Sequence, residues 1–239
     1  MIGGPIMTGA EAVAATRLKI LSGGALRGLM LGIVPLFERS RAVKLDIEFG
    51  LSSVLQRQIE AGAWFDLALL PRQELEGLAA KGRIAPGVTD VTRSTVGLAV
   101  RAGAAKPDIA TVAAFRQALI AARSIAYSDG PSGAYIAELL CRLGLAEAMQ
   151  PKTRLTSRPV AELVAAGEAE IGLQQIVAIL PVAGAELVGP LPSELQNVIV
   201  YAAGIAAASR QPAEAGDFIG FLATEEAKRL IRAKGMAPG

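Results

Sequence analysis

The chain has 239 residues, enough for one large domain or for two lobes of roughly 100 residues each, and either can bury a substantial core. Apolar residues make up 52% and aromatic residues only 4%, a composition typical of buried parallel strands covered by helices. A net charge of +2 without a basic patch excludes nucleic acid as a partner, and the absence of histidine excludes His-based acid–base catalysis and the common zinc sites.

The start of the chain does not look like an export signal. Residues 1–16 have neither a basic region nor an apolar core, although Met7 and the alanine-rich stretch after it could be the remnant of a leader. Two compartments therefore stay open: the cytoplasm, or the periplasm if a signal is missing from this sequence. Nowhere does an apolar run reach about 18 residues, so we expect a chain that does not span a membrane.

The first part of the chain repeats a strand–loop–helix unit. The expected strands are 17–21, 44–49 and 65–70, and the expected helices are 26–39, 54–61 and a third that follows Pro71 and runs to about residue 80. Gly62 is expected to stop the second helix. Three such units in a row predict a parallel sheet with right-handed crossovers.

The same alternation continues to the end of the chain. The expected strands are 95–100, 124–127, 154–156, 171–174, 186–189 and 198–207, and the expected helices are 111–122, 134–144, 160–166 (closed by Gly167), 213–221 and 225–234 (capped by Thr224). We interpret residues 103–107 as the first passage between two lobes. The segments together predict an α/β fold, with lobe I formed by 16–98 plus 200–239 and lobe II by 99–199.

Two side chains of reactive types receive structural interpretations. The single cysteine, Cys141, lies in an expected helix beside two leucines and is interpreted as a buried structural thiol. Asp66 follows Trp64 and Phe65 at the start of a strand, which we expect near the region between the lobes. We interpret it as an acceptor of backbone hydrogen bonds rather than as a general base.

Five loops lie where α/β folds bind ligands, at the carboxyl ends of strands, and most of them open a helix whose free N–H groups favour anions. Small residues there let a ligand approach the backbone, and serines add hydroxyl donors. For any single loop, helix capping is the better explanation of its serine, but the recurrence in both halves favours a site for a small anion. The candidate ligand-binding residues are Ser22, Gly24, Ala25, Ser52, Ser53, Ser132, Gly133, Arg158, Val160, Gln174 and Gln175.

No cofactor motif accompanies these loops. Gly23, Gly24 and Gly28 do not have the spacing of G-x-G-x-x-G, and the chain lacks the G-x-x-x-x-G-K-[ST] of nucleotide triphosphatases. We therefore expect no nucleotide, no metal and no other cofactor.

Residues 49–67, FGLSSVLQRQIEAGAWFDL, resemble a serine loop, the helix after it and the following strand in the molybdate-binding proteins of ABC importers and their type II periplasmic-binding-protein-like relatives. Weaker similarity lies in 131–135 and in the closing helices, so the resemblance spans nearly the whole chain. It implies two lobes, each a mostly parallel sheet flanked by helices, with an oxyanion between them. It also implies an ABC permease as partner and a place in the periplasm.

The resemblance also implies roles for single residues. Ser52 matches a serine that binds the oxyanion, and Val160 matches a backbone N–H donor. Ala25 stands where the family has a serine, Ser132 replaces an alanine that donates through its backbone, and Gln175 falls on a tyrosine. Because two side-chain hydroxyl donors have changed, a carboxylate is favoured over molybdate.

An organic acid would suit the remaining polar side chains. The amides of Gln174 and Gln175 can donate and accept, and Arg158 or Arg27 could clamp a carboxylate with two hydrogen bonds. For both arginines, a solvated surface position is the favoured interpretation.

Two other functions stay open. One is an isomerase acting on an unsaturated organic acid such as aconitate, which without histidine would use Asp129, a serine or Tyr135 to transfer the proton. The other is a cytoplasmic ligand-sensing module, which the lack of a visible signal favours. We identify no catalytic machinery that decides for an enzyme.

Overall fold

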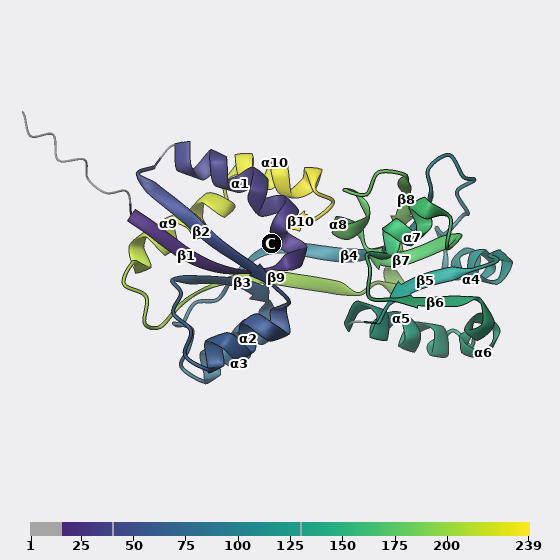
Figure 1. The fold of residues 1–239 in the computed structure, drawn as a ribbon, viewed down its shortest axis with the longest axis horizontal. Coiled ribbons are helices and arrows are strands. Elements are labelled where there is room, and N and C mark those ends of the chain that lie inside the picture. Colours follow the sequence, from purple (N-terminus) through teal and green to yellow (C-terminus); the bar gives the residue numbers. More distant parts are fainter. Residues whose placement is uncertain (1–15, 40, 130) are drawn as a thin grey trace, which may run out of the picture.

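A computed structural model describes residues 16–39, 41–129 and 131–239. Two lobes are joined by two long strands, β4 (Thr89–Arg101) and β9 (Val198–Ile205), which run side by side through the middle of the molecule (Figure 1). The segment around Met7, interpreted above as the remnant of a leader, lies outside the described residues.

Lobe I is a sheet with helices on both faces. Its remaining elements are β1 (Thr16–Gly23), α1 (Arg27–Arg39), β2 (Val43–Gly50), α2 (Ser52–Glu60), β3 (Leu67–Pro71), α3 (Arg72–Ala80), α9 (Pro212–Leu222), α10 (Glu225–Ala233) and β10 (Ala237–Pro238). The strand order is β2-β1-β3-β9-β4, with β10 on the far side of β4. β1, β2 and β3 are parallel, as predicted, whereas β9 runs antiparallel to β3 because it returns from lobe II.

Apolar spacing along α1 shows why the helices cover this sheet. Leu29, Met30, Ile33 and Phe37 recur at helical intervals and are all fully buried. Phe37 meets Phe218 of α9 edge to face, with the ring centroids 5.0 Å apart. α1, α9 and α10 pack on one face of the sheet, and α2 and α3 pack on the other.

Lobe II repeats this arrangement on a smaller sheet. Its elements are α4 (Val112–Ala121), β5 (Ile125–Ser128), α5 (Pro131–Arg142), α6 (Ala146–Met149), β6 (Thr153–Thr156), α7 (Val160–Ala166), β7 (Ile171–Gln175), α8 (Ile176–Ile179) and β8 (Ala185–Pro190). β5 is parallel to both β6 and β7. The core on one face comes from α4, α5 and α6, and the core on the other from α7 and α8.

The chain passes between the lobes within β4, not at 103–107. Thr89–Thr95 of β4 pairs with β9, and Val96–Arg101 pairs with β7 and β8. Residues 103–107 follow the end of this strand in lobe II, so the predicted passage there is wrong. A continuous strand can change partners without a loop. Glycine and proline mark loops in a sequence, so they do not reveal such a change. The predicted lobe boundaries at 98/99 and 199/200 fall inside β4 and β9.

Several predicted helix ends are confirmed. Gly62 (φ +94°) follows α2, and Gly167 (φ +76°) ends α7, both in the left-handed region where glycine is favoured. The Thr224 hydroxyl accepts from the amide of Ala227 at 3.3 Å and caps α10.

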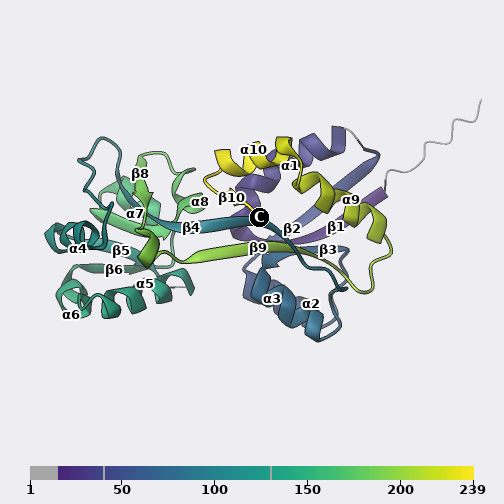
Figure 2. The same cartoon turned by 180° about the vertical axis from the view of Figure 1, so that it is seen from behind.

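The two lobes also touch away from the crossing strands. Gly235, in the turn after α10, lies so close to Ile176 and Leu180 that a methyl group on it would collide with both. Figures 1 and 2 show α8 and α10 on one side of β4 and β9, with α2, α3 and α5 on the other. Among the described residues, no helix is long and apolar enough to cross a membrane.

Candidate ligand-binding site at the junction of the lobes

The predicted loops face each other across the junction. The N-terminal ends of α1 and α2 lie at the end of lobe I that faces lobe II, and the N-terminal end of α5 lies at the opposing end of lobe II (Figure 1). Ser52 is the first residue of α2 and is partly exposed. A methyl group on Gly23 would lie 3.1 Å from the Ser52 hydroxyl oxygen, so a side chain at position 23 would crowd this hydroxyl.

A polar cluster joins both crossing strands to lobe II. The side-chain oxygen of Gln175 accepts from the hydroxyl of Ser94 on β4 at 3.3 Å and from that of Tyr201 on β9 at 3.4 Å. Tyr201 also lies beside Gly23, since a methyl group there would be 3.8 Å from its ring. Burial raises the pKa of Tyr201, so its phenol stays protonated and can donate. Ser52, Gly23, Tyr201 and Gln175 therefore form one continuous group across the junction.

A guanidinium stands at the same end of lobe I. Arg27 begins α1 and stacks on the ring of Phe49 near the end of β2, with its Cζ atom 4.4 Å from the ring centroid. Such a contact contributes roughly 0.5–1 kcal/mol at an exposed site and fixes the plane of the guanidinium. Gly24 lies beside these residues, since a methyl group on it would be 3.6 Å from the Gly50 carbonyl oxygen.

In lobe II the predicted loops are held by their own polar groups. The hydroxyls of Ser132 and Ser128 are 3.0 Å apart, and Gly133 lies so close to the Ser128 carbonyl that a side chain would collide with it. Val160, the first residue of α7, is fully buried. The Gln174 side-chain oxygen accepts from the amide of Ala161 at 3.1 Å and so caps α7.

The remaining predicted residues differ in their burial and in their partners. Ser22 is fully buried, and its hydroxyl lies 3.4 Å from the Gly23 carbonyl to which it donates. Arg158 pairs with Glu168 at 2.8 Å, so its guanidinium already has a carboxylate partner. Ala25 packs partly against the core of lobe I, and Ser53 is exposed on α2.

Asp66 has the structural role expected of it. It is fully buried, accepts from the amide of Lys19 at 3.0 Å and from the hydroxyl of Ser209 at 2.8 Å. Its predicted place near the junction is wrong, because it precedes β3 at the opposite end of the sheet from Tyr201.

Of the two named candidates for proton transfer, Tyr135 is bonded within lobe II, whereas Asp129 lies just before α5, whose N-terminal end faces lobe I. The Tyr135 hydroxyl donates to the carbonyl of Leu195 at 2.8 Å and accepts from Arg142 at 3.2 Å, so both its functions are used. Asp129 is exposed.

Cys141 is exposed, so the prediction of a buried thiol is wrong. The two leucines before it face the core, and the next position along the helix turns away from them. Cys141 borders a hollow of about 470 Å³ beside β6, which Tyr127, Leu140 and Leu155 also line. This mostly apolar hollow has none of the predicted donors. In the described part of the chain, no group of three Asp, Glu or Cys side chains is placed to hold a metal ion.

A family model described as "Bacterial extracellular solute-binding protein" matches residues 18–237, which covers both lobes and both crossing strands. The chain belongs to this family. A related sequence is an aconitate isomerase from a Pseudomonas species, 33% identical over 231 residues, with 93% of this chain and 88% of the relative covered.

Solved structures confirm the type II periplasmic-binding-protein fold. The substrate-binding domain of a proposed molybdenum ABC transporter from Clostridium difficile superposes with a TM-score of 0.81 at 21% identity, covering 94% of this chain and 99% of that one. The periplasmic molybdate-binding protein of Azotobacter vinelandii gives a TM-score of 0.73, also at 21% identity, with 93% and 99% covered. At 21% identity these similarities show the fold alone. It is the fold that the sequence resemblance implies.

Sequence reasoning missed three polar residues at the junction. Ser94 and Tyr201 lie in strands that read only as β-rich runs, and their role follows from the change of partners within β4. Glu74 lies in the first turn of α3, where an acidic residue is ordinary. Its neighbours Leu75 and Leu78, both buried, were the available signal that this side of the helix faces inward.

Proposed function

We propose that this chain binds a small organic anion with more than one carboxylate group between its lobes. The observation that carries the proposal is Arg27, whose guanidinium is held by Phe49 at the loop-bearing end of lobe I. It has no carboxylate partner among the described residues. The planar fork of an arginine matches a carboxylate with two parallel hydrogen bonds.

Neutral donors around the junction support a ligand of this kind. Ser52 offers its hydroxyl and the free amides at the start of α2, which favour negative charge. Ala25 and Gln175 stand where the molybdate-binding relatives have hydroxyl donors in the sequence resemblance. A site that combines a fork-shaped cation with amide and hydroxyl groups suits an extended carboxylate better than a compact tetrahedral oxyanion.

The family supports a role in uptake. We infer that an ABC-type permease receives the ligand from this protein and that the protein works outside the cytoplasmic membrane. Binding between the lobes would stabilise a closed arrangement, with bending within β4 and β9 as the hinge.

A second function is favoured by one observation, the 33% identity to an aconitate isomerase over nearly the whole chain. The same site would then hold an unsaturated tricarboxylate and interconvert its cis and trans forms.

Calorimetric titration against trans-aconitate, cis-aconitate, citrate, molybdate and sulfate tests the binding proposal. We expect saturable binding of at least one of the carboxylates and weaker or no binding of molybdate and sulfate. Arg27→Ala should weaken carboxylate binding about tenfold or more, since a hydrogen-bonded charge contributes roughly 1.5–3 kcal/mol. Arg57→Ala, an exposed arginine on α2, is the matched control. Tight binding of molybdate with no binding of any carboxylate would contradict the proposal.

Incubation with each aconitate isomer, followed by proton NMR, separates binding from catalysis. Interconversion above the rate without protein supports the isomerase. Saturable binding of aconitate with no interconversion would exclude the isomerase and support a binding protein.

A further inference from the structure

Glu74 carries a buried carboxylate oxygen without a hydrogen-bond partner. Its Oε2 atom is shielded from solvent, and no described side chain or backbone group bonds it. Leaving a buried acceptor unsatisfied costs roughly 1–3 kcal/mol, and more for a charged group. Such an oxygen is satisfied when a ligand from outside the chain bonds it, or when the carboxylate takes up a proton.

Glu74 lies at the candidate ligand-binding site. It is in the first turn of α3, directly after β3, whose carboxyl end lies at the same edge of the sheet as Gly23. Pro71, the last residue of β3, pairs with Tyr201 on β9. The negative charge of Glu74 acts on Tyr201 and helps to raise the pKa of that phenol, after the larger effect of burial.

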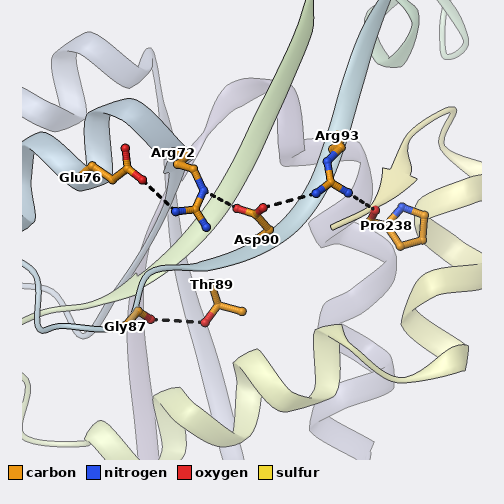
Figure 3. A network of polar contacts seen from close by, with 7 residues as sticks. All are labelled: Arg72, Glu76, Gly87, Thr89, Asp90, Arg93 and Pro238. Carbon is orange, nitrogen blue, oxygen red and sulfur yellow. Dashed lines mark hydrogen bonds and ion pairs between the residues drawn. The ribbon is translucent and has the colours of Figure 1, made fainter.

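The charged groups around Glu74 are occupied with one another. Arg72 bonds Asp90 at 2.6 Å and Glu76 at 2.8 Å, and Asp90 continues to Arg93 at 3.4 Å (Figure 3). Residues 72 and 76 share one side of the helix, and residue 74 projects from the other.

The elements packed against α3 supply no cation to Glu74 either. On α2 the titratable side chains are Arg57, which is exposed, and Glu60, which is bonded to Gln56 and to Lys81. β3 has no titratable side chain, and that of β9 is Tyr201. Burial is the cause that raises the pKa of the Glu74 carboxyl.

We propose that Glu74 is a ligand-binding residue of the junction and that it holds a proton when the anion is bound. As a neutral acid it donates an O–H to an oxygen of the anion, which satisfies the buried carboxyl and removes a charge that would repel the ligand. The proposal rests on the proposed function, since it needs an anion between the lobes.

A proton held in the complex links binding to pH. Placing negative charge beside Glu74 raises its pKa further, so the complex takes up a proton. Between the pKa of Glu74 in the free protein and that in the complex, affinity falls as pH rises, by up to about tenfold per pH unit. Below this window Glu74 is protonated in both states, and the dependence disappears.

Titration calorimetry with trans-aconitate, in two buffers of different ionisation enthalpy at about pH 5.5 and about pH 7.5, measures this proton uptake. We expect the wild-type chain to take up more protons on binding than Glu74→Gln, and its affinity to fall more steeply with pH. The ligand and the buffer contribute equally to both proteins and cancel in the comparison. Glu76→Gln, on the same helix but paired with Arg72, should behave like wild type.

The outcomes separate this proposal from the one on which it rests. If Glu74→Gln binds with the proton uptake and pH profile of the wild type, Glu74 does not hold the proton, although the site stands. If the wild type binds none of the tested anions, the proposed function fails and the role of Glu74 fails with it. Binding by Glu74→Gln with less proton uptake and a shallower pH profile than the wild type supports both.

Discussion

Among single residues, Ser52 offers a hydroxyl at the end of lobe I that faces lobe II. It begins α2, is partly exposed and lies against Gly23, which Tyr201 also approaches. Ser52→Ala should weaken anion binding about 10- to 100-fold, because it removes a hydrogen bond to a charged ligand. Ser53→Ala, at the exposed position next to it, should weaken binding much less. Calorimetry with trans-aconitate gives both values, and equal losses would count against a direct contact by Ser52.

Glu74 should reduce the stability of the protein without ligand. Its folded-state pKa is raised, so the stability associated with its protonated form is present at low pH and is lost as pH rises through that pKa. Glu74→Gln should therefore raise the melting temperature by about 2 °C at pH 7.5, or roughly 0.5–1 kcal/mol, and leave it unchanged near pH 4. Thermal unfolding at the two pH values checks this, and a rise of equal size at both would show that the effect is not electrostatic.

Residue roles were predictable where they follow from local sequence and were missed where they depend on distant strands. The acceptor role of Asp66 follows from its place at the start of a strand. The Tyr201–Gln175 bond joins residues 26 positions apart, and only the path of β9 brings them together. Cys141 was predicted to be buried but is exposed, because Leu139 and Leu140 already fill the buried side of its helix.

At the scale of elements, two glycines that look alike in the sequence should respond oppositely to a methyl group. Gly77 lies within α3 with open space around it, so Gly77→Ala should stabilise the chain by roughly 0.5–1 kcal/mol. Gly204 lies in β9, where a methyl group would be 2.8 Å from Ile84 and 3.3 Å from Leu75. Gly204→Ala should destabilise by roughly 1–3 kcal/mol. Urea unfolding measures both, and a loss for Gly77→Ala would contradict the packing described for α3.

The order of helices and strands was predictable because each carries its own signals. Apolar periodicity placed α1 and α2, and glycine stops placed the end of α7. What the pattern did not contain is β4 as one strand shared by two lobes. The first half of β4 is mostly polar and the second half mostly apolar. In the sequence, such a segment resembles a short strand preceded by a turn.

At the scale of the whole molecule, binding between lobes joined by two strands should change the shape. We expect the radius of gyration from small-angle X-ray scattering to decrease when a bound carboxylate saturates the protein. Arg27→Ala at the same ligand concentration should give a smaller decrease. An unchanged radius on saturation would mean that the ligand binds without closure.

Carboxylate binding at the junction of the lobes, the claim on which the proposed function depends, can be followed by backbone amide NMR shifts during a titration with trans-aconitate. We predict saturable shifts that cluster at 23–27, 51–53, 132–133, 160 and 174–175. Shifts confined to the hollow beside β6, or no shifts at saturating ligand, would contradict the claim.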